Sequence, residues 1–151
     1  GMSFIDAAFL KKSDIQSGIL TYRRHKTNQV LHIKIIKPIK ELVDRYSSND
    51  SPYLLPIITR PHCDERRQYE TALRRVNKSL KTIAGMVKLP IPLTTYVSRH
   101  AWATIAKSKN IPVNVISDAL GHDSIATTQI YLASIDTSTI DRANELIIKD
   151  L

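Results

Sequence analysis

Cysteine is nearly absent from this sequence, and long apolar runs are absent altogether. The one cysteine, Cys63, cannot form an internal disulfide and provides no cluster of thiolates for a metal, so we expect it to be inert. No run of about 18 apolar residues could span a bilayer, and the residues after Gly1 lack the basic and apolar order of a signal peptide. These absences favour a protein of a reducing bacterial cytoplasm, with no membrane partner and no metal.

Acidic residues are outnumbered by basic ones. The sequence has 22 Lys and Arg against 14 Asp and Glu, which gives a formal net charge of +8 and a pI near 9.7. Such an excess commonly serves a polyanion, and nucleic acid is the polyanion that we expect here. A length of 151 residues suits one domain with its own core and is too short for two ordinary ones, so we interpret residues 1–151 as one domain.

Apolar periodicity and capping residues predict a mainly helical chain. The expected helices lie at residues 3–10, 38–46, 64–88, 95–110, 112–119, 124–133 and 138–149. Alternation of apolar residues around Tyr22, Leu31 and Ile33 predicts a β-hairpin over residues 19–36, whose polar turn has Lys26 at its tip. The sequence therefore predicts an α+β fold class, mainly α with a small antiparallel β-sheet.

The same periodicity predicts which side of each helix is buried. On the helix at 38–46 the expected inward residues are Ile39, Leu42, Val43 and Tyr46. On the helix at 64–88 they are Tyr69, Leu73, Val76, Leu80, Ile83 and Val87. On the helix at 95–110 they are Val97, Ala101, Thr104 and Ile105, and we expect Trp102 to pack in the core.

The remaining faces of the helix at 64–88 are cationic. The residues that we single out for contact with nucleic-acid phosphates are Arg67, Arg74, Lys78 and Lys81. A solvated helix face explains such a run equally well, and both alternatives stay open at this point.

Three short motifs follow one another in the second half of the chain. They are R-H-x-x-A-T over residues 99–104, L-G-H over 120–122 and T-x-x-Y over 128–131. Their order, and the nine residues from His122 to Tyr131, resemble the tyrosine recombinases of the phage integrase family. The resemblance covers essentially the whole chain, and it implies the catalytic-domain fold of that family and site-specific recombination of double-stranded DNA.

The resemblance also assigns chemical roles. Tyr131 is implied to attack the scissile phosphate and form a 3′-phosphotyrosyl ester, while Arg99 binds a non-bridging oxygen through its planar, permanently charged fork. His122 is implied to donate a hydrogen bond to the same phosphate. Lys26, on the hairpin, corresponds to the family lysine that protonates the leaving 5′ oxygen. This chemistry uses no cofactor, no ATP, no Mg²⁺ and no small-molecule substrate.

Two positions depart from the family pattern. Where the family usually has a histidine three residues before Arg99, this chain has Tyr96, which we expect to donate a hydrogen bond near the phosphate. The family's first arginine precedes a glycine that corresponds to Gly1, so by the resemblance it lies just outside this chain, and Asp6 falls at the family's acidic position. Removing one preorganised donor costs about 10²–10³ in rate, so we expect DNA binding with impaired cleavage. His100 is interpreted as structural.

In the family, a helical DNA-binding domain precedes the catalytic domain, and the segment after the nucleophile docks on a neighbour in a DNA-bound homotetramer. The helix at 138–149 would be that exchanged segment. Two alternatives remain open at this stage: a non-catalytic DNA-binding regulator in which Tyr131 is structural, and a type IB topoisomerase that relaxes DNA, with a telomere resolvase as a more remote one. The target site and the direction of recombination do not follow from the sequence.

Overall fold

The structure is a computed structural model that describes residues 1–47 and 50–133. The chain divides into two compact units, residues 1–102 and residues 103–151, and each unit is described by itself. The interpretation of residues 1–151 as one domain stays a prediction. The predicted helix at 138–149 lies outside the described residues. In the described part of the chain, no helix is long and apolar enough to cross a membrane.

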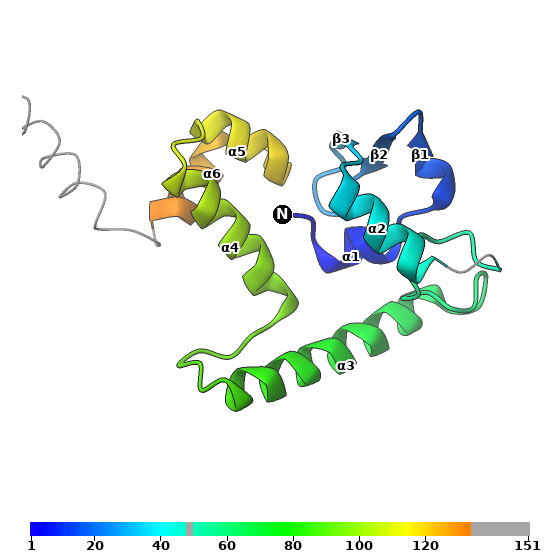
Figure 1. Cartoon of the computed structure of the whole chain (residues 1–151). Helices are drawn as coiled ribbons and strands as arrows, with labels where there is room; N and C mark the ends of the chain where they lie inside the picture. The colour runs from blue at the N-terminus through cyan, green and yellow to red at the C-terminus, as the bar shows by residue number, and fades with distance from the viewer. Residues whose placement is uncertain (48–49, 134–151) are drawn as a thin grey trace, which may run out of the picture. The chain divides into compact units, whose positions relative to one another are not determined.

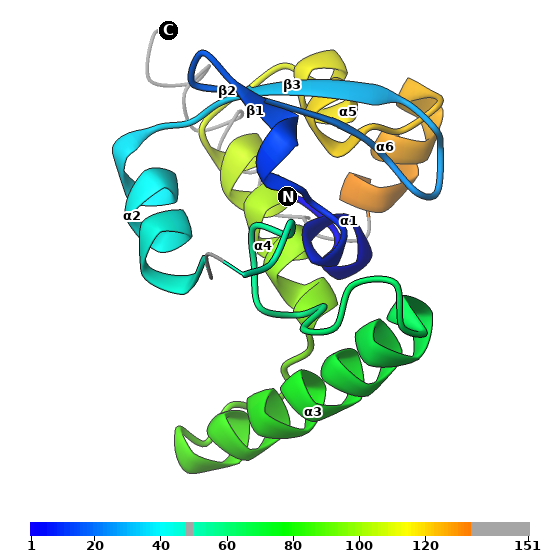
Figure 2. The same ribbon diagram turned by 90° about the vertical axis from the view of Figure 1, so that its right-hand side faces the viewer.

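The first unit begins with helix α1 (Phe4–Ala8), which Ser3 caps by accepting a hydrogen bond from the backbone N–H of Asp6. A 3₁₀ turn, η1 (Lys12–Asp14), leads into a three-stranded antiparallel sheet of order β1-β2-β3. The strands are β1 (Ile15–Gln16), β2 (Ile19–Arg23) and β3 (Val30–Lys34). Figures 1 and 2 show β2 and β3 side by side, joined by the hairpin turn.

The hairpin buries one face because alternate residues of a strand point to the same side. Leu20 pairs with Ile33 and Tyr22 with Leu31 across β2 and β3. Leu20 and Tyr22 form a core cluster with Leu10 and Leu54, and the predicted hairpin is therefore confirmed.

Two helices follow the sheet. Helix α2 (Lys37–Tyr46) begins with Pro38 in its first turn, and α3 (Glu65–Met86) is capped by Asp64, whose side chain accepts from the backbone N–H of Arg67. Both helices occur where the periodicity predicted them. Their apolar faces are less buried than predicted. Among the residues predicted to face inward, about half or more of the surface is exposed at Leu42, Tyr46, Ile83 and Val87.

Helix α4 (Thr95–Ser108) runs from the first unit into the second. In the second unit it is followed by α5 (Val113–Leu120) and α6 (Ile125–Ala133), which lie against each other in both views (Figures 1 and 2). The core of this unit is made of Ala103, Ala106, Ile116, Leu120 and Leu132. Gly121 ends α5 with a φ of 59°, a left-handed conformation that glycine adopts without a steric penalty.

The predicted inward face of α4 is wrong. Ala101 is exposed and Ile105 is 54% exposed, whereas the buried residues of α4 are Arg99, Ala103 and Ala106. Positions 99, 103 and 106 form an i, i+4, i+7 stripe on the opposite side of the helix. The periodicity argument assigned Arg99 to the solvent-exposed side of α4. The predicted orientation of α4 about its own axis was therefore wrong. Trp102 is 37% exposed and does not pack in the core as predicted.

Candidate active site

Arg99 is the most buried of the predicted catalytic residues of the first unit, with 4% of its surface exposed. Its Nη1 donates a hydrogen bond to the carbonyl oxygen of Gly1. The start of α4 is fixed on α3, because the backbone N–H of Thr95 donates to Oδ1 of Asn77 at 2.8 Å. A guanidinium held this rigidly is suited to recognising a phosphate, because little side-chain entropy remains to be lost on binding.

Tyr96 lies one turn before Arg99 and lines the same cavity, which has a volume of about 380 Å³ and walls from α1, α3 and the start of α4. Tyr96 is 54% exposed, and its ring meets that of His100 edge to face with the ring centroids 4.5 Å apart. Tyr96 and Arg99 are thus brought together as the helical spacing predicted.

Arg99 belongs to a buried charged group that surrounds Tyr22. Burial and the neighbouring Asp6 carboxylate raise the pKa of Tyr22, while Arg24 and Arg99 oppose them. Tyr22 therefore stays neutral at physiological pH. Arg24 is 6% exposed and Asp6 is 3% exposed, so the cationic and anionic side chains compensate each other away from water.

Lys26 is exposed in the turn between β2 and β3, and the turn itself is firmly held. The backbone N–H of Arg24 donates to the carbonyl of Gln29, and that of Asn28 donates to the carbonyl of Arg24, both at 2.9 Å. Asp6 anchors the turn to α1, because its Oδ1 accepts the backbone N–H of His25 at 2.9 Å and its Oδ2 lies 3.5 Å from Nε of Arg24. Asp6 was assigned to the acidic position of the family pattern without a partner, and its contacts with Arg24 and His25 explain why a carboxylate is buried there.

We expect Asp6→Ala to destabilise the protein by about 3 kcal/mol, because it removes the carboxylate of a buried ion pair and the acceptor of the His25 backbone N–H. The matched control is Asp44→Ala, which removes an exposed partner of Lys40 and should cost only a few tenths of a kcal/mol. Urea unfolding of both variants measures the difference. Equal losses would contradict the anchoring role of Asp6.

The second unit carries the other two predicted catalytic residues. Past the Gly121 cap, the backbone N–H of His122 donates to the carbonyl of Ser117 at 3.1 Å, which fixes the start of the loop between α5 and α6. Tyr131 lies on α6, half-buried against the core of this unit. The rings of His122 and Tyr131 meet edge to face, with the centroids 6.0 Å apart and an angle of 74° between the planes. The interval from L-G-H to T-x-x-Y therefore brings the imidazole beside the phenol.

The four residues predicted to contact phosphates are all exposed on α3. With 100° between successive residues, Arg67, Arg74, Lys78 and Lys81 lie within an arc of about 60° along about 21 Å of helix. In the described part of the chain the cations of α3 make one ion pair, between Arg66 and Glu70, which lies outside this stripe.

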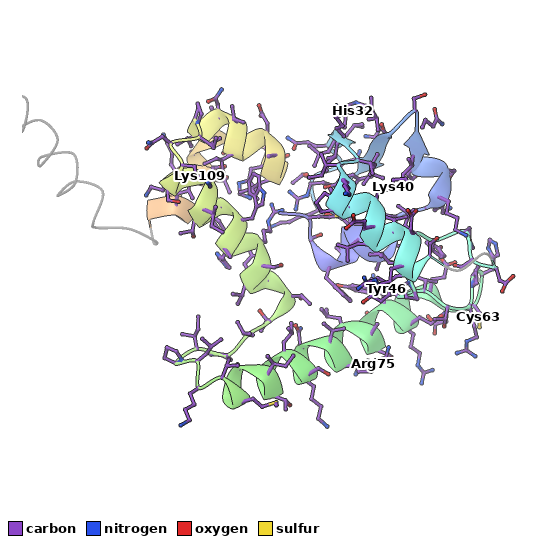
Figure 3. All side chains as sticks on the ribbon, in the orientation of Figure 1. His32, Lys40, Tyr46, Cys63, Arg75 and Lys109 are labelled. Atoms are coloured by element: carbon purple, nitrogen blue, oxygen red, sulfur yellow. The ribbon has the colours of Figure 1, made fainter. Side chains whose placement is uncertain are left out.

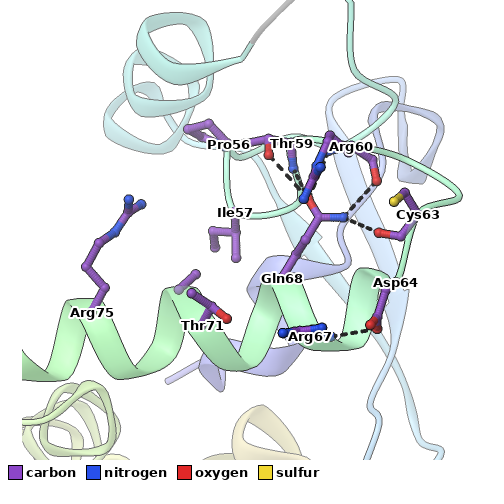
Figure 4. A pocket seen from close by; sticks show the side chains of 11 residues that line it. Pro56, Ile57, Thr59, Arg60, Cys63, Asp64, Arg67, Gln68, Thr71 and Arg75 are labelled. Atoms are coloured by element: carbon purple, nitrogen blue, oxygen red, sulfur yellow. Dashed lines mark hydrogen bonds between the residues drawn. The ribbon is translucent and has the colours of Figure 1, made fainter.

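Arg67 also lines a cavity of about 500 Å³ together with Arg60 and Arg75 (Figure 4). Gln68 holds the loop of Arg60 against α3: its Oε1 accepts the backbone N–H of Arg60 at 2.9 Å, and its Nε2 donates to the carbonyl of Arg60 at 2.8 Å. Cys63 is exposed in the same loop (Figure 3). The position of Arg60 could not be predicted from the sequence, because an arginine in an irregular loop belongs to no periodic pattern.

Among residues 1–47 and 50–133, no three His, Cys, Asp or Glu side chains lie together as a possible set of metal ligands.

Comparisons with known proteins agree with the motifs. The model of the phage integrase family matches residues 3–137. The chain belongs to the phage integrase family. The family match includes the Arg99, His122 and Tyr131 motifs and the hairpin of Lys26. It confirms the resemblance drawn from the sequence.

One relative within the family is the tyrosine recombinase XerA of Pyrococcus furiosus, which is 31% identical over 97% of this chain. The chain spans about half the length of that relative, with 51% covered. The crystal structure of a XerA recombinase superposes with a TM-score of 0.67 at 20% identity, covering 95% of this chain and 52% of that one.

A second similar structure is that of the XerH site-specific recombinase bound to a palindromic difH substrate, in a post-cleavage complex. It has a TM-score of 0.56 at 20% identity and covers 93% of this chain and 40% of that one. Together with the XerA structure it confirms the predicted fold class, which is mainly α with a small antiparallel sheet.

Proposed function

We propose that this chain is the catalytic part of a site-specific tyrosine recombinase that cuts and rejoins double-stranded DNA. The observation that carries the proposal is the pairing of His122 with Tyr131 in one unit of a phage integrase family chain. The similar XerH structure is a complex with its DNA substrate after cleavage, which supports DNA as the substrate class. The alternatives of a non-catalytic regulator and a relaxing topoisomerase find no specific observation in their favour.

In the proposed reaction, Oη of Tyr131 attacks the phosphorus of the scissile phosphodiester. The Oη–P bond forms while the P–O5′ bond breaks, so the energy of the phosphodiester is stored in a 3′-phosphotyrosyl ester. The phenol loses its proton to solvent, and Lys26 gives a proton to the leaving 5′ oxygen. Attack of a 5′ hydroxyl on the ester reverses each step and joins the strands, without a cofactor.

The charge that develops on the phosphate needs donors that are already in place. Arg99 would supply a bidentate, charge-assisted pair of hydrogen bonds, His122 a single one, and Tyr96 a phenolic donor. Arg99, Lys26 and Tyr96 come from the first unit, and His122 and Tyr131 come from the second.

Trapping of a covalent protein–DNA adduct tests this proposal. The natural polypeptide that carries this chain is incubated with a suicide duplex, which has a nick close to the scissile phosphate. Cleavage then releases a short fragment with the new 5′ hydroxyl, which diffuses away so that the strands cannot be rejoined. The target site comes from selection of bound sequences out of random DNA. A band that survives denaturation is expected. Tight, site-specific binding without any such band would favour a non-catalytic regulator.

We propose further that the cationic stripe of α3 binds the DNA backbone, with Arg60 and Arg75 at its edge. Each neutralised phosphate releases counterions, so binding should weaken steeply with salt. Arg67→Gln combined with Lys78→Gln should lower the slope of log K against log salt by about 2. Fluorescence anisotropy with a labelled duplex at several salt concentrations measures the slope.

The matched control changes the net charge by the same amount elsewhere. Lys37→Gln combined with Lys40→Gln removes two exposed lysines of α2, each already paired with a carboxylate one turn away. The slope should stay within the error of the wild-type value. An equal change in both double variants would mean that net charge, and not the α3 stripe, governs binding.

The assembly that we propose is a homotetramer on DNA, in which the segment at 138–149 contacts a neighbouring copy. The support is the family resemblance of the preceding motifs.

A further inference from the structure

Thr128 is a motif residue to which the proposed reaction gives no role. It belongs to the T-x-x-Y motif and lies on the buried side of α6, with 0% of its surface exposed. Its Oγ1 lies 2.7 Å from Nδ1 of His122, which is the side chain proposed to donate to the phosphate. Either the Thr128 hydroxyl or Nδ1 of His122 donates the proton in this hydrogen bond.

The burial of Thr128 decides which atom donates. A threonine hydroxyl has one proton and two lone pairs, and a buried hydroxyl proton without an acceptor costs about 1–3 kcal/mol. Among the residues that the structure describes, Nδ1 of His122 is the hydrogen-bond partner of this hydroxyl. If Nδ1 carried the imidazole proton, the hydroxyl proton would have no acceptor among the described residues. The Thr128 O–H therefore donates, and Nδ1 of the neutral ring accepts.

We propose that Thr128 is a positioning residue that fixes the tautomer of His122. With Nδ1 accepting from Thr128, the single proton of the neutral imidazole lies on Nε2. Neutral His122 can then donate a hydrogen bond from Nε2 to a non-bridging oxygen of the scissile phosphate. This inference rests on the proposed function, and it adds that the His122 contribution does not require the charged imidazolium.

The consequence is a specific pH dependence. Without the Thr128 hydroxyl, the neutral ring is free to hold its proton on Nδ1, which presents a lone pair from Nε2 to an anionic oxygen. The imidazolium would then be the one form that always donates from Nε2, and its population falls as the pH rises through the range in which histidines ordinarily titrate. Cleavage by such a variant should fall between pH 6 and pH 8 relative to wild type.

In the described part of the second unit, the titratable side chains besides His122 are Lys107, Lys109, Asp118, Asp123 and Tyr131. All of them stay the same in the comparison. Because all are present in both proteins, the ratio of variant to wild-type rates removes their contributions.

Thr128→Val and Thr128→Ser separate positioning from packing. Valine keeps the branched shape and removes the hydroxyl, whereas serine keeps the hydroxyl and removes a methyl group. If Thr128 only filled space, valine would be the milder change. The tautomer proposal expects the reverse for every readout that depends on His122.

The first measurement uses the protein without DNA. Nitrogen-15 NMR of histidine-labelled protein distinguishes protonated from unprotonated ring nitrogens, and the His122→Asn variant assigns the His122 signals among the five histidines. At pH 8, wild type and Thr128→Ser should show the proton on Nε2, and Thr128→Val should show a larger fraction on Nδ1. A proton on Nδ1 in wild type, or an unchanged ring in Thr128→Val, would overturn the proposal.

The second measurement follows cleavage of the suicide duplex from pH 6 to pH 8. The rate of Thr128→Val relative to wild type should fall as the pH rises over this interval, because the neutral ring replaces the imidazolium. The relative rate of Thr128→Ser should stay level. If the Thr128→Val rate were lower than wild type by the same factor at every pH, Thr128 would be a packing residue and not a positioning residue. If wild type formed no adduct at all, the proposed function would fail, while the NMR result would still decide the tautomer.

Discussion

Replacing Tyr131 with phenylalanine should abolish the covalent attachment of DNA, with a loss of about 10⁴-fold or more in cleavage rate, as expected when a nucleophile is removed. The change deletes one oxygen and keeps the ring that packs against the core of the second unit. The fold and the affinity for DNA should therefore persist, with a dissociation constant within about twofold of wild type. Gel analysis of adducts and anisotropy of the labelled duplex measure the two effects separately.

The matched control is Tyr46→Phe, at the exposed C-terminal end of α2 (Figure 3). It makes the same chemical change outside the family motifs and should leave adduct formation unchanged. Equal loss of binding and cleavage in Tyr131→Phe would remove Tyr131 from the role of nucleophile and make it a structural residue.

Replacing Lys26 with alanine should slow cleavage of ordinary DNA by about 10²–10⁴-fold, the usual contribution of a general acid. The 5′ oxygen is a poor leaving group unless it is protonated, and Lys26 is the proposed donor. A 5′-bridging phosphorothiolate leaves readily as a thiolate without a proton. The variant should therefore cleave the phosphorothiolate at close to the wild-type rate, and the comparison of the two substrates is the measurement.

Lys34→Ala serves as the control, because it removes another exposed lysine of the same sheet, at the end of β3. Both substrates should react at the wild-type rate in this variant. If Lys26→Ala slowed the phosphorothiolate as much as ordinary DNA, Lys26 would contribute to binding or to positioning and would not be the acid.

Much of the secondary structure could be predicted from the sequence, because its signals are local. Ser3 and Asp64 cap the starts of α1 and α3 and Gly121 ends α5, each with a residue type that favours such a position, and the alternation around Tyr22 predicted the hairpin. The motifs of Arg99, His122 and Tyr131 identified the family because three linked elements in one order are far more specific than any single residue.

The burial of α4 could not be predicted, because the decisive residue is charged. A periodicity argument places arginine on the water side, and Arg99 is 4% exposed. The small residues Ala101, Ala103 and Ala106 give little contrast between the two faces, so the position of Arg99 reversed the prediction. A buried cation is compatible with folding only where anions and carbonyl oxygens compensate it, and such partners come from distant parts of the chain.

Hydrogen bonds between residues far apart in the sequence could not be predicted either. Asp6 holds the backbone of His25, 19 residues later, and no local pattern connects α1 with the hairpin turn. Gln68 holds the loop of Arg60 in the same way. The contact between Thr128 and His122 joins two motifs whose residues were recognised while their hydrogen bond was not.

The most direct test of the proposed reaction is to identify the residue that becomes covalently linked to DNA. The adduct formed on a suicide duplex is digested with nuclease and protease, and mass spectrometry locates the nucleotide on the peptide. A single modified residue is expected, Tyr131, linked through the 3′ phosphate. A linkage to Tyr96 or to any other residue, or a 5′-phosphate linkage to Tyr131, would contradict it.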